Sequence, residues 1–412
     1  MVRINKWPDK LAHRYFFGYF VRYLILCSLL LPWTWDNSAN ASFRQQIRYF
    51  GTLGAATFDG KYAYDDTDSG LNVSDNTRFG LNISVTDDRE WSFFAELLAQ
   101  PSALEAPWYF VNWRAADSVI IRIGKTRFVN WLFSETRSIG YTYPWPELPA
   151  DVYRINPLTS MHGVSAEYSL DTSIGGITFD LQVGTIDGEY LGTIVKSDLA
   201  TSGTLTYQID DFKWIFSGLY SDRLQLELGP IALTQVEAHY LSSSIRSQLG
   251  PVVLISEIGK IRAASTAAER DRSRSQAARA RAQIQSNPQK VADPELQAAL
   301  GKSILTDGAV ISATTGYLHI GYEIGSFQPY LLGVLLVADK DSIFTKSQSR
   351  YGGGVFWLAS DQVALKLQAT HVAIDNKNYG LSSVPQESIL LGTKDLGVRP
   401  ATLVQASVDF LF

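Results

Sequence analysis

The chain has 412 residues, with 36 Lys and Arg against 41 Asp and Glu, which gives a formal net charge of −5. This length allows two or three globular domains or one large β domain. A charged fraction of 19% with 46% hydrophobic residues excludes global disorder. The slight acidity offers no electrostatic case for a nucleic-acid partner, and the one cysteine, Cys27, excludes an internal disulfide framework or a cysteine-based metal site.

The first 41 residues have the composition of a secretory signal. Residues 1–22 are basic, residues 23–33 are apolar, and residues 38–41 (Ser-Ala-Asn-Ala) place small side chains where a signal peptidase cuts. A basic, an apolar and a small-residue segment in this order mark a signal peptide. We therefore predict that residues 1–41 are removed and that residues 42–412 form the mature protein.

The rest of the chain alternates between apolar and polar residues. Within residues 78–86, Phe79, Leu81, Ile83 and Val85 share one face, while polar or small residues share the other. A period of two residues is the signature of a β-strand. The pattern recurs and predicts sixteen strands of about ten residues, a length that suits a tilted strand crossing a bilayer. They are expected at 44–58, 76–86, 91–100, 107–115, 119–127, 161–170, 177–186, 199–209, 212–220, 230–241, 250–259, 310–324, 328–337, 350–359, 362–374 and 401–412, and residues 224–228 could extend the tenth.

The predicted connections alternate between long and short. Long ones fall at 59–75, 101–106, 128–160, 187–198, 221–229, 260–309, 338–349 and 375–400, and mostly short ones lie between them, including 242–249. A barrel threaded up and down across a membrane shows this alternation, with short periplasmic turns and long outer loops. Closure leaves no edge of unpaired backbone groups in lipid. The sequence thus predicts an all-β, closed, antiparallel up-and-down transmembrane β-barrel of 16 strands.

The last residues extend an apolar face to the end of the chain. Val404, Ala406, Val408, Phe410 and Phe412 alternate with mostly polar residues. This segment resembles the C-terminal strand by which the insertion machinery recognises outer-membrane barrels. With the signal, the strands and the alternating loops, residues 42–412 resemble a Gram-negative outer-membrane porin. The resemblance implies a cell outer-membrane location, a homotrimer, recognition of Phe412 by the insertion machinery, contact with outer-membrane lipid and lipopolysaccharide, and no cofactor.

The third long connection, residues 128–160, is rich in proline and aromatic residues. Prolines fix the backbone, and aromatic side chains give a loop something to bury. In trimeric porins the connection at this place folds into the barrel, so the resemblance implies a constriction loop; a surface loop packed over its neighbours is the alternative. Its acidic residues are expected to face basic residues on the lumen wall. The candidate constriction residues are Glu135, Arg137, Tyr141, Tyr143, Trp145, Glu147, Asp151 and Arg154.

Charged residues on the polar strand faces are candidates for the lumen wall. An Arg or Lys on the lipid face costs about 2–4 kcal/mol at the bilayer midplane, which places such residues inside. Opposed charges around a lumen tune ion preference, although simple solvation of the lumen is the plainer explanation for any one residue. The principal wall candidates are Arg48, Arg78, Glu96, Arg114, Arg122 and Glu167. Further candidates are Arg127, Lys213, Lys366, Asp180, Glu323 and Asp409.

Residues 260–309 differ from the rest in being rich in alanine and arginine. This composition favours helix, and Pro294 could begin a second short helix. As the sixth long connection, the segment is expected to be an extracellular helical loop. Its arginines could contact lipopolysaccharide phosphates or a partner, or the helix could simply be solvated.

No catalytic or metal-binding motif stands out. The histidines after residue 41 show no ligand spacing, and neither a G-x-S-x-G elbow nor a P-loop occurs. Together with the absence of such motifs, the resemblance to porins implies a passive, non-enzymatic diffusion channel for small hydrophilic solutes. Three alternatives stay open: a porin specific for anions or organic acids, a barrel-anchored binding or adhesion protein, and an outer-membrane barrel enzyme.

Overall fold

A computed structural model describes most of the chain after the first 42 residues. The described residues are 43–58, 71–73, 76–87, 90–101, 103–153, 156, 158–190, 193–228, 231–287, 289–290, 293–342, 347–374 and 401–412. The predicted signal peptide and the predicted constriction residue Arg154 lie outside them. The chain divides into two units, Met1–Phe43 and Arg44–Phe412, and the following description concerns the second.

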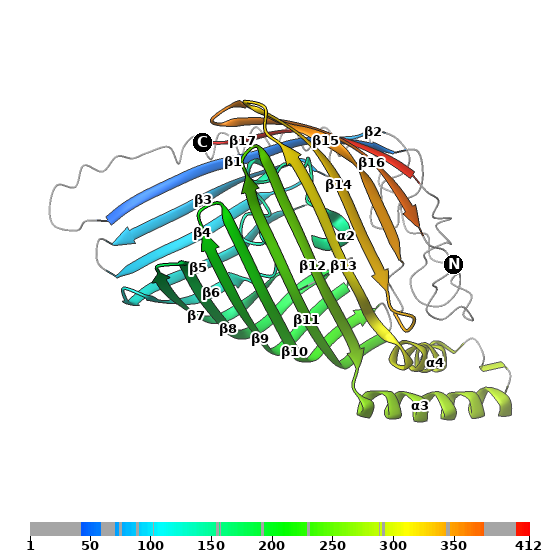
Figure 1. Ribbon diagram of the computed structural model, residues 1–412. Helices are drawn as coiled ribbons and strands as arrows, with labels where there is room; N and C mark the ends of the chain where they lie inside the picture. Colours follow the sequence, from blue (N-terminus) through cyan, green and yellow to red (C-terminus); the bar gives the residue numbers. More distant parts are fainter. Residues whose placement is uncertain are drawn as a thin grey trace. The chain divides into compact units, whose positions relative to one another are not determined.

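Sixteen long strands form one closed antiparallel barrel (Figure 1). Each long strand pairs with the next along the chain, and β17 pairs with β1 through contacts such as Thr52↔Asp409, which closes the ring. The two-residue β2 also pairs with β1. The predicted fold class is thereby confirmed. The strands are β1 (Phe43–Phe58), β2 (Leu71–Asn72), β3 (Arg78–Asp87), β4 (Trp91–Ala99), β5 (Leu104–Ala116), β6 (Val119–Arg127), β7 (Ser160–Thr172), β8 (Gly175–Tyr190), β9 (Thr193–Ile209), β10 (Phe212–Leu228), β11 (Ile231–Leu249), β12 (Val252–Ser265), β13 (Ala309–Tyr322), β14 (Phe327–Ala338), β15 (Gln348–Ser360), β16 (Val363–Ile374) and β17 (Ala401–Leu411).

Strands β8 to β11 are longer than the sequence predicted. Residues 187–198, 221–229 and 242–249 were expected to be connections, but most of them continue the hairpins, with pairs such as Gln225↔Lys196. Residues 224–228 belong to β10 and not to the following strand. The polar run before them forms a β-bulge, in which Arg223 has a φ of 52° and the pairing register shifts. In these strands backbone pairing continues beyond the point where the apolar face ends. The connections between them are therefore shorter than expected, and long and short connections alternate less clearly.

The outward face of the barrel is apolar. In β17 the exposed positions include Val404 and Val408, while Gln405, Ser407 and Asp409 are buried inside. Aromatic rings lie near the strand ends: Trp91 stacks on Trp113 with centroids 5.9 Å apart. Such a surface, with its backbone fully paired by closure, suits a hydrocarbon environment.

The described connections include the following helical segments. The 3-10 turn η1 (Gly140–Thr142) and the short α2 (Ala150–Tyr153) belong to the connection between β6 and β7. Helices α3 (Ala267–Ser286) and α4 (Pro294–Asp307) lie between β12 and β13, capped by the side chains of Thr266 and Asp293. Within the part of the chain that the structure describes, no helix has the length and apolar character needed to cross a membrane.

Candidate functional site

The segment between β6 and β7 lies inside the barrel and contacts its wall on several sides. Lys366 on β16 donates to the carbonyl oxygen of Gly140 at 2.6 Å. Thr315 on β13 donates to the carbonyl oxygen of Asp151 at 2.8 Å. Figure 1 shows α2 enclosed by the strands. We call residues 128–153 the internal loop.

One side of the internal loop packs against an apolar part of the wall. Trp145 is fully buried and lies edge-on to Tyr317 of β13, with ring centroids 5.2 Å apart. Trp131 meets Tyr240 of β11 in the same way at 5.5 Å. The wall contributes buried aliphatic side chains to this cluster, among them Val253, Ile255, Leu332, Val334 and Leu336. This half of the barrel interior is therefore a hydrophobic core and not a water-filled passage.

A buried carboxylate anchors the loop within this apolar half. Glu257 of β12 accepts hydrogen bonds from the backbone N–H of Leu132 at 2.7 Å and from the hydroxyl of Tyr153 at 3.1 Å. The side chain is 1% exposed. Because an unsatisfied polar group in such a place is costly, these two bonds fix the position of the loop backbone.

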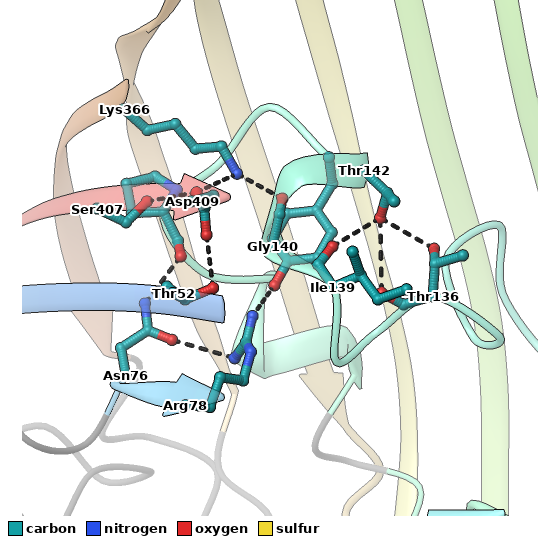
Figure 2. Close-up of polar contacts among 12 residues, drawn as sticks. Thr52, Asn76, Arg78, Thr136, Ile139, Gly140, Thr142, Lys366, Ser407 and Asp409 are labelled. Atoms are coloured by element: carbon teal, nitrogen blue, oxygen red, sulfur yellow. Dashed lines mark hydrogen bonds and ion pairs between the residues drawn. The ribbon is translucent and has the colours of Figure 1, made fainter. Parts of the chain in front are cut away.

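A polar cluster holds the opposite side of the loop (Figure 2). Asp409 accepts from Thr52 at 2.5 Å and from Ser407 at 2.9 Å, and it pairs with Lys366 at 2.8 Å. Lys366 and Asp409 are both fully buried, and Lys366 also bonds the carbonyl oxygen of Gly140. The ion pair thus joins two adjacent strands to the tip of the internal loop.

Gly140 is the position at which the loop approaches the wall most tightly. A Cβ added there would overlap the Asp409 carboxylate and the Thr52 hydroxyl. We therefore expect Gly140→Ala to displace the loop and weaken its contact with Lys366, because the clash involves a side chain held by three partners. Limited proteolysis should cut the internal loop of this variant and spare that of the unmodified protein; equal resistance would contradict the close approach.

Arg78 of β3 extends the polar cluster. Its guanidinium donates to the carbonyl oxygen of Ser138 at 2.8 Å and to the hydroxyl of Tyr143. Burial raises the pKa of Tyr143 to about 12, so this loop hydroxyl stays neutral well into the alkaline range. A third bond, to Asn76 at 3.3 Å, orients the guanidinium.

The base of the loop is fastened by a second buried ion pair. Arg127, the last residue of β6, pairs with Glu96 of β4 at 2.6 Å. It also donates to the hydroxyl of Ser138 at 2.7 Å and to the carbonyl oxygen of Glu135 at 2.6 Å. Its guanidinium lies over the ring of Trp108 at 4.9 Å. These contacts set the direction in which the chain leaves β6 and enters the barrel.

The remaining side of the lumen is polar and accessible. Arg122 of β6 pairs with Glu167 of β7 at 2.5 Å and with Asp180 of β8 at 3.2 Å, and its side chain is 20% exposed. The internal loop presents Glu135, which is exposed and interacts electrostatically with Arg122, and Arg137, which is half-buried. Partly exposed charges of both signs line this side.

The structure brings some of the predicted site residues together and separates others. Arg78 contacts Tyr143, and Glu96 lies at the loop base, whereas Arg48 and Arg114 are exposed on strand faces away from the loop contacts described above. Of the loop acids expected to face basic residues on the wall, Asp151 forms an ion pair with a wall arginine that was not among the candidates, and other loop side chains bond to neutral groups of the wall. Asp151 pairs with Arg350 at 3.1 Å, Glu147 accepts from Gln405 at 3.1 Å, and Tyr141 donates to the carbonyl oxygen of Asp361 at 2.9 Å.

Sequence reasoning missed the apolar part of the wall. In β14 the inward positions Tyr330, Leu332, Val334 and Leu336 are as apolar as the outward ones. Glu257 and Arg350 were also missed, although a single Glu within the apolar run of β12 is a usable signal. In the described part of the chain, no group of three His, Cys, Asp or Glu side chains is arranged to hold a metal ion.

Comparison with known proteins bears on the fold. Neither the protein-family models nor the curated sequences contain a match. Among solved structures, the anion-selective porin from Comamonas acidovorans superposes with a TM-score of 0.53 at 12% identity, over 90% of this chain and all of that one. The chain has the fold of the 16-stranded porins. Two further structures support this. Salmonella typhi OmpF superposes with a TM-score of 0.52 at 9% identity, over 89% of this chain and 97% of that one. The outer-membrane channel DcaP of Acinetobacter baumannii superposes with a TM-score of 0.53 at 8% identity, over 90% of this chain and 97% of that one.

Proposed function

We propose that this porin-fold chain is a passive diffusion channel for small hydrophilic solutes in the outer membrane of a Gram-negative bacterium. The observation that carries the proposal is the division of the lumen by the internal loop. One half is filled by the cluster around Trp145, and the other keeps accessible charges at Arg122, Glu167 and Glu135. Solutes would pass along the charged side, down their gradient, with no chemical step and no cofactor.

The passage would be sized by the internal loop and tuned by its charges. Arg122 and Glu167 face each other across neighbouring strands, so a permeating ion meets both signs within a short distance. Fixed charges at a constriction set ion preference, while the water-filled remainder sets conductance. Because two buried ion pairs and an apolar core hold the loop, we assign it a static narrowing role and no gating role.

Single-channel recording in a planar bilayer tests the proposed function. We expect discrete current steps that vary linearly with voltage from protein whose gel migration changes on heating, which shows that it is folded. Folded protein that inserts into the bilayer and gives no current would refute the proposal.

A preference for anions is the second candidate function. Arg114, Lys213 and Arg246 lie near the short-turn ends of β5, β10 and β11, on the faces that point inward. Within the described residues none of the three side chains has an ion pair or hydrogen bond, and Lys213 and Arg246 are neighbours in the pairing register. Glu323 nearby accepts from Gln248 at 2.7 Å. Unpaired cations at a channel mouth concentrate anions there.

Reversal potentials across a tenfold KCl gradient test this preference. We expect the wild-type channel to favour chloride and the variant Arg114→Gln/Lys213→Gln/Arg246→Gln to favour it several-fold less. The single variant Arg122→Gln would be an unsuitable control, because it breaks two ion pairs. A wild-type channel that favours potassium would exclude anion preference but leave the diffusion channel intact.

The remaining features of the proposal concern assembly. We infer export by a signal peptide at residues 1–41, recognition of the C-terminal strand by the insertion machinery, and a homotrimer. The end of the barrel's last strand supports the second inference: Phe412 exchanges backbone hydrogen bonds with Tyr49 at 2.7 and 2.8 Å, and the residue is 55% exposed. Cross-linking in membranes, resolved by size, would test the trimer.

A further inference from the structure

Helices α3 and α4 pack together as a hairpin on the barrel between β12 and β13 (Figure 1). α3 packs on α4 through a narrow face that includes Ser273, Ala277 and Ala280. Two ion pairs fasten the helices: Lys302 with Glu269 at 2.7 Å and Arg274 with Asp307 at 2.8 Å. α4 in turn contacts β11, β12 and β13. The hairpin is therefore held in place by packing and ion pairs. One face of α3 packs against α4, and most of the remaining surface of α3 is exposed.

The exposed surface of α3 is strongly basic in a chain of net negative charge. Arg262, just before the hairpin, is neutralised by Asp341 at 2.8 Å, and its hydrogen bond lowers the pKa of that carboxyl. Arg274 is neutralised by Asp307. The side chains of four further arginines have no ion pair or hydrogen bond among the described residues: Arg270, which is half-buried, and Arg272, Arg279 and Arg281, which are exposed. No requirement of folding explains these four.

The four arginines lie in two rows. With 100° between successive residues, Arg270 and Arg281 fall on one flank of the packing face, and Arg272 and Arg279 fall on the other. The strip between the rows, on the side of α3 opposite α4, carries mostly small side chains. It includes Ser275, Ala278 and Ala282, and its acidic member is Asp271. Long cationic side chains can therefore reach from both flanks toward a flat surface laid over small residues.

We propose that α3 binds the phosphate groups of lipopolysaccharide. Guanidinium groups form bidentate, charge-assisted hydrogen bonds with phosphate oxygens, and clusters of arginines beside a membrane recognise anionic headgroups. The outer leaflet of the outer membrane presents phosphates in a lateral array. The proposal rests on the assignment of the chain to that membrane with its long connections outward, and it assigns the lipopolysaccharide contact that the resemblance implies to four named residues of α3.

Binding of fluorescent lipopolysaccharide to the purified protein in detergent tests the proposal. The test variant is Arg270→Gln/Arg272→Gln/Arg279→Gln/Arg281→Gln, because glutamine keeps the helix propensity and removes the charge. We expect its affinity to fall roughly tenfold at low salt, since each exposed ion pair contributes modestly, and the difference to shrink as salt is added. The matched control is Arg114→Gln/Lys213→Gln/Arg246→Gln, which removes cations elsewhere and should bind as the wild type does.

A second measurement uses the unmodified protein. Lipopolysaccharide stripped chemically of its phosphates should bind roughly tenfold more weakly than the intact form. Equal binding of the two forms, or equal affinity of the α3 variant and the wild type, would overturn the proposal and leave α3 as a solvated helix. Conductance reports separately on the channel, because the α3 variant should conduct as the wild type does; a wild-type protein that binds lipopolysaccharide and fails to conduct refutes only the proposed channel.

Discussion

Replacing Trp145 with alanine is expected to lower the free energy of unfolding by about 3–5 kcal/mol, the range for large aromatic residues removed from a core. The ring is fully buried and contacts Phe133, Tyr317 and His319 with centroids 5.2–5.7 Å apart. Its indole N–H has no hydrogen-bond partner in the described part of the chain, so alanine removes packing alone. The internal loop would lose its contacts with Tyr317 and His319 of the wall.

Denaturant unfolding in detergent, followed by circular dichroism, measures this loss. The same variant should show noisier single-channel currents, because a loosened loop samples several positions in the lumen. Tyr141→Phe is the matched control: it alters an aromatic residue of the same loop that is only half-buried, and it removes one hydrogen bond to Asp361. A stability of Trp145→Ala within about 1 kcal/mol of the wild type would show that the loop is not anchored by this core.

Replacing Lys366 with methionine is expected to destabilise the barrel by about 3–5 kcal/mol, because it leaves the Asp409 carboxylate buried without its cation. Both side chains are fully buried, and the ammonium group also bonds Gly140 and lies 4.7 Å from the ring centre of Tyr143. The remaining partners of Asp409, Thr52 and Ser407, are neutral hydroxyl donors. They cannot replace the lost charge.

The double variant Lys366→Met/Asp409→Asn separates charge from packing. Asparagine keeps an oxygen that can accept from Thr52 and removes the buried charge, so we expect it to recover most of the lost stability. Unfolding of the four proteins completes a double-mutant cycle. If the double variant is less stable than Lys366→Met alone, the cost of the single variant does not come from an uncompensated carboxylate.

The barrel could be predicted from sequence because its signal is local. Alternation within a segment such as 78–86 reports which side chains face lipid, and the bilayer makes that requirement uniform around the ring. The long hairpins of β8 to β11 were missed because backbone pairing beyond the hydrocarbon needs no apolar face. The β-bulge at Arg223 is polar, so its sequence has the composition of a loop and the strand pattern is interrupted there.

The site was less predictable because its contacts are distant in sequence. Lys366 and Asp409 each occupy a strand position whose side chain points into the barrel. That alternation does not indicate which residue of the internal loop they contact. Gly140 became significant only when its neighbours were known. The apolar wall of β14 could not be recognised either, because a strand with two apolar faces gives no indication of which face is inside.

Thiol accessibility along β5 tests the central claim most directly: that alternate residues face lipid and lumen around a closed barrel. The one cysteine, Cys27, lies in the predicted signal peptide, so single cysteines can be placed in residues 42–412 and the protein reconstituted in lipid vesicles. We predict that cysteines at the inward positions Asn112 and Arg114 react with a membrane-impermeant maleimide, while those at the outward positions Val111 and Trp113 react only with a lipid-soluble one. Equal reaction of all four with the impermeant reagent, or the reverse pattern, would contradict the account.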